Sequence, residues 1–170
     1  MSKAYLLGAL HDATERKYTF RLGQKSQAYV DFIADLVRHL NHKAWTYREG
    51  KNRNLFIVEF SKTVLSNLKI KTTKEKVDYI RGYFDAEGGM AKSLKTRFYL
   101  YFAQKDKADV NQVRNYLMDL GISCGVLHNP SSKADPNYWR FFVLTKSHKD
   151  FAKKIGSWHP EKSGILRMKI

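Results

Sequence analysis

Hydrophobic and polar residues alternate with a period of two in two separate stretches of this chain, residues 16–24 and residues 92–104. In the first stretch Tyr18, Phe20 and Leu22 are separated by polar or small residues, and the second stretch has the same spacing. A period of two is typical of a β-strand with one buried face. We therefore predict a half-buried strand in each half of the chain.

Apolar residues at helical spacing follow each of these strands, over residues 29–40 and 110–120. Asn41 and Gly121 come directly afterwards, and both residue types favour the left-handed conformation that ends a helix. Each half then continues with two further strands and a short closing helix. These elements are predicted at 43–49, 54–61 and 63–68 in the first half, and at 122–127, 138–145 and 148–155 in the second.

A short helix-like motif opens each half, over residues 4–14 and 79–89. Each copy runs through apolar residues to a glycine, Gly8 or Gly82, continues apolar, and ends in an acidic turn of small residues. Glycine lets two helices approach closely because it has no side chain. With this motif, both halves have the order helix, strand, helix, strand, strand, helix.

The composition points to an anionic partner, because the formal net charge is +15 in 170 residues. A nucleic acid backbone is the densest such partner, whereas the simpler interpretation is a solvated lysine surface. No window is long and apolar enough to span a bilayer, no N-terminal signal pattern is present, and the single Cys124 excludes an internal disulfide framework and a cysteine zinc site. We expect a soluble intracellular protein of the cytoplasm or nucleoid, or of an organelle in a eukaryote, with no membrane partner.

The repeated motif resembles that of the LAGLIDADG homing endonucleases in their two-repeat, single-chain form. Residues 80–88 are close to the family pattern, and residues 6–14 match as a repeat partner. The resemblance implies an α+β fold of two pseudo-symmetric αββαββα-like repeats, with the motif helices packed at the centre and antiparallel sheets forming a DNA-binding saddle. The first repeat would span residues 1–70, the linker 71–76, and the second repeat 77–170.

The resemblance also implies a site-specific homing endonuclease of the intron-encoded type, which hydrolyses double-stranded DNA and leaves 3′ overhangs. It would act as a monomeric pseudo-dimer on an asymmetric target. Mg²⁺, or another divalent cation such as Mn²⁺, would be required, because cations between carboxylates can activate water and neutralise the leaving oxygen. The alternative is a non-cleaving protein on the same scaffold, either an intron RNA maturase or a DNA-binding regulator.

The irregular first motif favours that alternative. In the second motif Glu87 stands where the family has its catalytic, metal-binding acid, five residues after the glycine. In the first motif that place falls on Ala13 when the glycines are aligned, and on Thr14 when the shared Asp-Ala pair is aligned. Asp12 is our candidate for the second metal ligand if the helix ends early and the turn redirects its side chain. Three alternatives remain open: Glu15 is the ligand instead, the first site is degenerate, or Asp12 has a purely structural role.

Matching Gln-Lys pairs follow the first strand of each half: Gln24 with Lys25, and Gln104 with Lys105. By resemblance they belong to the polar ring that orders the attacking water, and lysine charge would stabilise negative charge developing at the phosphate. The competing interpretation is a strand-end cap beside a solvated lysine.

Strand alternation predicts which side chains face DNA, and the three tryptophans Trp45, Trp139 and Trp158 are assigned to the core. Arginine on a two-stranded ribbon can address guanine in the major groove. Tyr99 and Tyr101 have a second possible place, under the sheet. The predicted DNA-binding residues are Lys17, Thr19, Arg21, Thr46, Arg48, Lys95, Arg97, Tyr99, Tyr101 and Arg140.

Overall fold

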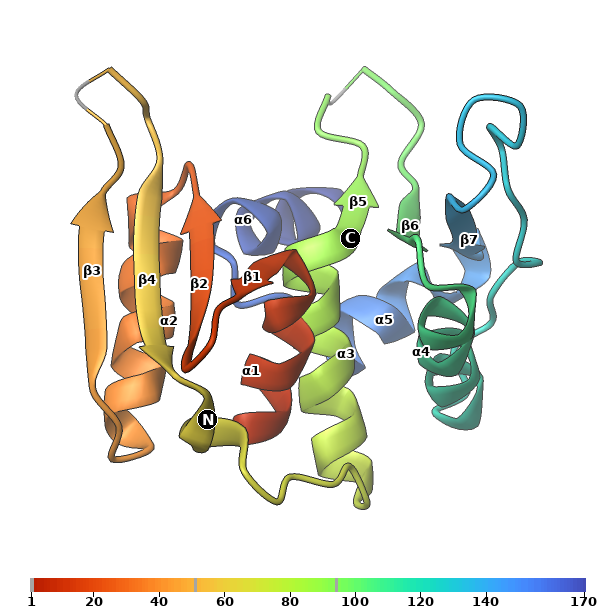
Figure 1. Ribbon diagram of the computed structural model, residues 1–170. Coiled ribbons are helices and arrows are strands. Elements are labelled where there is room, and N and C mark those ends of the chain that lie inside the picture. The colour runs from red at the N-terminus through yellow and green to blue at the C-terminus, as the bar shows by residue number, and fades with distance from the viewer. Residues whose placement is uncertain (1, 51, 94) are drawn as a thin grey trace. The chain divides into compact units, whose positions relative to one another are not determined.

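A computed structural model describes residues 2–50, 52–93 and 95–170, and divides the chain into two compact units (Figure 1). The N-terminal unit is Met1–Ala86 and the C-terminal unit is Glu87–Ile170. Each unit combines helices with one antiparallel sheet, so the predicted α+β class is confirmed. Among the described residues, no helix is long and apolar enough to cross a bilayer.

The N-terminal unit is built on a four-stranded sheet in the order β1-β2-β4-β3. Helix α2, Gln27–His39, covers one face of this sheet and buries its apolar side against Leu22, Val58 and Phe60. Ser26 caps its first turn, and Asn41 with φ 63° ends it as predicted. The strands are β1 Ala13–Glu15, β2 Thr19–Gln24, β3 Ala44–Arg48 and β4 Phe56–Ser61, and a short 3₁₀ helix, η2, follows at Lys62–Leu65.

The two motif helices, α1 Lys3–Ala9 and α3 Thr73–Glu87, touch through their backbones at the motif glycines (Figure 1). A Cβ added to Gly8 would stand 2.1 Å from the carbonyl oxygen of Tyr79, and one added to Gly82 would stand 2.0 Å from that of Tyr5. Any side chain at either position would therefore push the helices apart. The packing of the motif helices against each other is confirmed.

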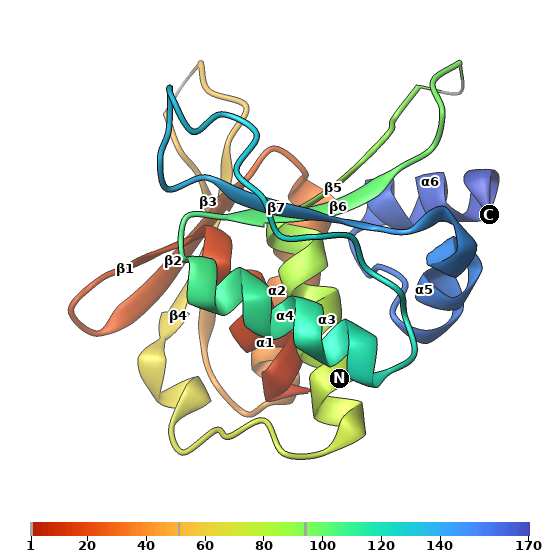
Figure 2. The ribbon, with the colours of Figure 1, turned by 90° about the vertical axis from the view of Figure 1, so that its right-hand side faces the viewer.

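The C-terminal unit has a three-stranded sheet in the order β5-β6-β7, with α4 packed against β6 and β7 (Figure 2). Its core includes the stacked rings of Phe102 and Phe141, whose centroids are 5.2 Å apart. The strands are β5 Gly88–Met90, β6 Leu100–Gln104 and β7 Trp139–Val143; the helices are α4 Lys107–Asp119, the 3₁₀ turn η3 Thr145–Ser147, α5 His148–Lys154 and α6 Pro160–Lys169.

Local periodicity placed the long helices well and overextended several strands. The strand predicted from residue 16 begins at Thr19, and that predicted over 92–104 is β6 alone, with Leu94 outside the described residues. Residues 122–127 form only an isolated bridge between Cys124 and Val143, and the helix predicted at 63–68 is the shorter η2. Strands β1 and β5 and helix α6 were not predicted; the two strands have three residues each, too few to show a period.

Candidate nucleic-acid interface and acidic site

Asp12 is the last residue of a 3₁₀ turn, η1 Leu10–Asp12, which ends the first motif and leads directly into β1. Its carboxylate is exposed and accepts a hydrogen bond from the side-chain amide of Gln24, the last residue of β2. The strand register explains this contact: Ala13 pairs with Leu22, and Gln24 lies two residues further along the same strand. The predicted pair Asp12 and Gln24 is therefore brought together within the N-terminal unit.

Glu87 occupies the corresponding place in the C-terminal unit. It is the last residue of α3, directly before β5, and Gly88 pairs with Phe102, two residues before Gln104. Glu87, Gln104 and Lys105 line one open cavity of about 370 Å³, together with Tyr101, Ala103 and Tyr138. The predicted pair Glu87 and Gln104 therefore has the same strand relationship as Asp12 and Gln24.

A 3₁₀ turn accounts for the one-residue mismatch between the motifs. The acid follows the glycine by four residues in the first motif and by five in the second. The first motif leaves the α-helix at Ala9 and finishes in η1, whereas the second stays α-helical to Glu87. Because a 3₁₀ helix rises more per residue than an α-helix, fewer residues reach the strand. Asp12, rather than Ala13 or Thr14, is the structural counterpart of Glu87.

The other candidate acid of the first motif, Glu15, lies at the far end of β1. Its exposed carboxylate forms an ion pair with Lys62. It thus has a lysine partner, whereas Asp12 has a glutamine partner. The geometry favours Asp12 over Glu15 as the acid of the first motif.

The lysines that follow the two glutamines also have matching places. Lys25 directly precedes Ser26, the N-cap of α2, and Lys105 directly precedes Asp106, the N-cap of α4. Both lysines are exposed, and the backbone N–H of Lys105 donates a 2.7 Å hydrogen bond to the side-chain oxygen of Gln104. Each unit therefore presents an acid, a glutamine and a lysine from equivalent strand and helix ends.

The donor atoms at these two places suit a hard divalent cation. Carboxylate and amide oxygens are the ligands that Mg²⁺ prefers, and Mn²⁺ also accepts them. Within the described ranges, no group of three His, Cys, Asp or Glu side chains is clustered as a metal site. Mg²⁺ is commonly held by one or two carboxylates and keeps several waters or substrate phosphates as its other ligands.

A lysine from the C-terminal helix contacts the turn after Glu87. Lys162 of α6 donates a 2.7 Å hydrogen bond from Nζ to the carbonyl oxygen of Gly88, in a part-buried setting. An ion pair of 2.8 Å between Lys92 and Glu161 joins the same helix to the segment after β5. The sequence did not predict α6, so Lys162 was not found as a residue close to this site.

The face of the N-terminal sheet opposite α2 carries two of the predicted DNA-facing residues, Thr19 and Arg21. Thr46 and Arg48 do not lie on that face: they pair with Val58 and Phe56 on the α2 side of the sheet, where they line a small pocket with residues of α2. Trp45 and Tyr47 occupy the outer face instead and are 52% and 42% exposed.

The assignments of Thr46 and Arg48 to the outer face and of Trp45 to the core were therefore wrong. Strand β3 is at the edge of the sheet, and four of its five residues are exposed. Its sequence therefore carries no clear inward-outward alternation. Only pairing with β4 decides which of its side chains share the face of Arg21.

The corresponding face of the C-terminal sheet is aromatic. Tyr101 on β6 is paired with Phe142 on β7, and the guanidinium of Arg140 lies 5.5 Å and 4.9 Å from the centroids of these two rings. Tyr99 lies just before β6, is 39% exposed, and packs edge-on against Phe142. Tyr99 and Tyr101 are therefore on the outer face rather than under the sheet. Phe142 was missed because its neighbour Phe141 is a core residue.

Besides Tyr99, three predicted DNA-facing residues are not on strands. Lys17 lies in the connection between β1 and β2, beside the exposed ring of Tyr18, and Lys95 and Arg97 lie in the connection between β5 and β6. The alternation of apolar and polar residues that predicted strands here extends into loops, where it does not assign side chains to a face of the sheet. Binding of DNA by these three residues stays a prediction, but their strand placement was wrong.

Comparison with known proteins agrees with this fold. The site defines an α+β protein in which two motif helices meet at their glycines, and each helix leads to a short strand beside an acid–glutamine pair. Residues 74–156 match the LAGLIDADG-like domain. No curated protein matches the chain. The C-terminal half of the chain therefore carries a LAGLIDADG-like domain, in agreement with the resemblance of the repeated motif.

Solved structures of two kinds resemble the whole chain. The homing endonuclease I-DmoI, in complex with DNA and Mn, is 22% identical with a TM-score of 0.67, covering 90% of this chain and 94% of that one. I-DmoI in complex with DNA and Ca is 21% identical with a TM-score of 0.71, covering 97% and 96%. Full-length DUF199/WhiA from Thermatoga maritima is 15% identical with a TM-score of 0.70, covering 98% of this chain and 59% of that one. At these identities the likeness establishes the fold.

Proposed function

We propose that this protein is a site-specific DNA endonuclease of the intron-homing type, in which Asp12 and Glu87 each help to bind a divalent cation. The observation that carries the proposal is the equivalent position of the two acids, each directly before a short strand and beside the glutamine that ends the neighbouring strand. The two repeats, residues 1–70 and 77–170 with the linker 71–76, would each supply one acid. The DNA and metal ions in the I-DmoI structures support the choice of substrate and cofactor.

The residues of each unit would have distinct tasks in phosphodiester hydrolysis. Bound Mg²⁺ or Mn²⁺ would polarise water and neutralise charge on the phosphate oxygens. Asp12 and Glu87 would supply carboxylate oxygens, and the amide of Gln24 orients the carboxylate of Asp12 through its hydrogen bond. The exposed ammonium groups of Lys25 and Lys105 would stabilise negative charge at the scissile phosphate.

The outer faces of the two sheets would hold the duplex. The positive net charge of +15 would provide phosphate contacts, and Arg21 and Arg140 stand on strands that could enter the major groove. Two non-identical faces suit an asymmetric target read by a single chain. Hydrolysis that leaves 3′ overhangs and action as a monomer are parts of this proposal that follow from the family resemblance.

The test uses the exon sequence that flanks the gene for this chain as a candidate target, in supercoiled and linear DNA. Wild type should cut it with Mg²⁺ or Mn²⁺ and should stop when EDTA is added. Asp12→Asn and Glu87→Gln should each reduce cleavage by about a hundredfold or more. The control variant Glu161→Gln, on the exposed pair with Lys92, should cut as wild type does. Metal-independent cutting, or full activity in both acid variants, would refute the proposal.

A non-cleaving RNA-binding protein, such as an intron maturase, is the second candidate function. The aromatic outer face of the C-terminal sheet favours it, because Tyr99, Tyr101 and Phe142 could stack on unpaired bases. Tight binding of the host intron RNA, together with no strand scission of any homing site, would select this function. Loss of RNA binding in Tyr101→Ser would then place the RNA on this face.

A further inference from the structure

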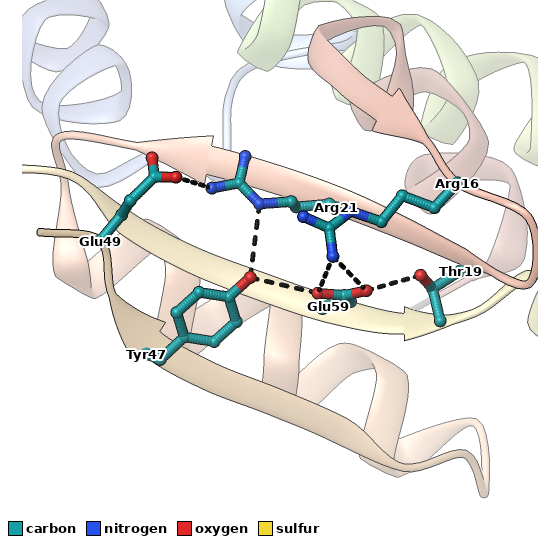
Figure 3. A network of polar contacts seen from close by, with 6 residues as sticks. All are labelled: Arg16, Thr19, Arg21, Tyr47, Glu49 and Glu59. Carbon is teal, nitrogen blue, oxygen red and sulfur yellow. Dashed lines mark hydrogen bonds and ion pairs between the residues drawn. The ribbon is translucent and has the colours of Figure 1, made fainter.

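A continuous polar network covers the outer face of the N-terminal sheet (Figure 3). The carboxylate of Glu59 on β4 accepts hydrogen bonds from Thr19 at 2.6 Å and from the hydroxyl of Tyr47 at 3.1 Å. The same hydroxyl accepts a 3.3 Å hydrogen bond from Nε of Arg21, whose Nη2 lies 2.7 Å from Glu49. The carboxylates of Glu59 and Glu49 are therefore connected through the Tyr47 hydroxyl and the Arg21 guanidinium.

The charges of this network cancel within the face. Arg16 lies 3.4 Å from both carboxylate oxygens of Glu59, so the two arginines, Arg16 and Arg21, are balanced by two glutamates. The hydrogen bond from Thr19, followed by that from Tyr47 and the nearby arginines, lowers the pKa of Glu59, which keeps it ionised at neutral pH. A neutralised face is unexpected in a chain of net charge +15 if its only task is to attract phosphates.

Non-specific DNA would meet a penalty on this face. An arginine that turned to a phosphate would leave the negative charge of Glu49 or Glu59 without its arginine beside a polyanion, and like charges at an interface are costly. The correct bases would remove that penalty, because amino groups of cytosine or adenine can donate to a carboxylate while guanine accepts from arginine. Rejecting wrong partners by repulsion is a common route to specificity.

We propose that Glu49 and Glu59 are specificity-determining residues, which hold the two arginines of this face back from phosphates unless matching base edges replace the internal partners. This inference rests on the proposed function, because it requires that the face meets DNA. Arg21 contacts both Glu49 and the Tyr47 hydroxyl, and only 16% of its side chain is exposed, so it is oriented before DNA arrives. The exposed Arg16, 52% accessible and only 3.4 Å from Glu59, would be released more readily.

The test measures the affinity of wild type and Glu49→Gln for a duplex of arbitrary sequence over a series of salt concentrations. Glu49 lies at the rim of the network, with 37% of its side chain exposed, so the variant should fold. Glu49→Gln should bind the arbitrary duplex about tenfold more tightly, and the slope of log K against log salt should steepen by about one, because Arg21 gains a phosphate. Selection from a randomised duplex library should also yield a less restricted set of sequences.

Glu161→Gln is the matched control, because it also replaces one carboxylate by a neutral amide and breaks an exposed ion pair, here in the other unit. It should change the affinity less and leave the salt slope and the selected sequences unaltered. The variant Tyr47→Phe removes the linking hydroxyl without a change of charge and should relax the selected sequences in the same direction as Glu49→Gln.

The outcomes separate this inference from the proposed function. If wild type cuts its target but Glu49→Gln behaves as Glu161→Gln does, the role of the glutamates is wrong and the endonuclease stands. If wild type binds no DNA at all, both proposals fail.

Discussion

The hydroxyl of Tyr5 donates a 2.6 Å hydrogen bond to the carboxylate of Asp85, which is 2% exposed. Tyr5 belongs to α1 and Asp85 to α3, so this bond joins the motif helices next to their glycine contact. The hydroxyl of Tyr29, on α2, lies 3.1 Å from that of Tyr5 and extends the network. A buried carboxylate is tolerated only when it is hydrogen-bonded, so these tyrosines keep Asp85 compatible with the core.

Tyr5→Phe should therefore destabilise the protein more than the loss of one exposed hydroxyl would. Removing the donor leaves a buried carboxylate without this partner, and we expect the free energy of unfolding to fall by about 1–3 kcal/mol. Urea denaturation measures the change, with Tyr18→Phe as the control because Tyr18 is 70% exposed. Equal stability of the two variants would show that the bond contributes nothing to the helix interface.

Gly82→Ala should be more damaging than its single added methyl suggests. The new Cβ would stand 2.0 Å from the carbonyl oxygen of Tyr5 and 2.9 Å from the amide nitrogen of Ala9, and backbone atoms cannot rotate away. We expect a loss of at least about 2–3 kcal/mol in unfolding free energy.

Gly164→Ala is the control for this substitution. Gly164 lies within α6, and a Cβ there would meet no atom within 4 Å. Alanine should stabilise that helix by up to about 1 kcal/mol. Opposite signs in the two variants are the expected thermal-melting result, and a neutral Gly82→Ala would rule out direct backbone contact between the motif helices.

His159 should make the protein less stable in mild acid. Burial, reinforced by Lys162 and Lys92 and opposed by Glu161, lowers the pKa of His159 from 6.5 to about 4. Between these values the unfolded chain binds a proton that the folded chain does not. The contribution of neutral His159 to the free energy of unfolding is therefore complete above pH 6.5. It is lost as the pH falls to about 4, by an amount on the order of 2–3 kcal/mol.

Denaturation of wild type and His159→Gln across pH 4–8 checks this contribution. The difference in unfolding free energy between the two proteins should shrink as the pH falls through that window. A constant difference would show that His159 does not titrate differently in the folded and unfolded states.

Lys162→Met should impair the site of Glu87 selectively, if the proposed function holds. The hydrogen bond from Lys162 to the carbonyl oxygen of Gly88 positions the turn that follows Glu87. Outer contacts of this kind commonly change metal affinity or activity by about ten- to a hundredfold. With the two DNA strands labelled separately, one strand should be cut more slowly by that factor while the other is cut normally.

Lys169→Met removes a 3.1 Å hydrogen bond from the same helix to the carbonyl oxygen of Ser93, in an exposed place, and serves as the control. It should leave both strand rates unchanged. Equal slowing of both strands by Lys162→Met would indicate general destabilisation and would contradict a positioning role.

Local sequence determined those structural elements whose signals, such as apolar spacing and helix-ending residues, lie within a few neighbouring positions. The helices α2 and α4 follow from apolar spacing, and their ends follow from Asn41 and Gly121, which adopt φ values of 63° and 78°. The repeated motif also predicted that Gly8 and Gly82 would meet, because only glycine permits so close an approach. These features depend on backbone preference and period, which a single sequence displays directly.

Only the tertiary structure decided which acid of the first motif corresponds to Glu87. The residue spacing from glycine to acid differs between the motifs, and the 3₁₀ turn that compensates for it leads directly into β1, which pairs with β2. Pairing likewise decided that Tyr47 rather than Arg48 shares a face with Arg21. Strand pairing joins residues far apart in the sequence, so the partners of an edge strand and the ends of a short turn are set by contacts that local periodicity does not contain.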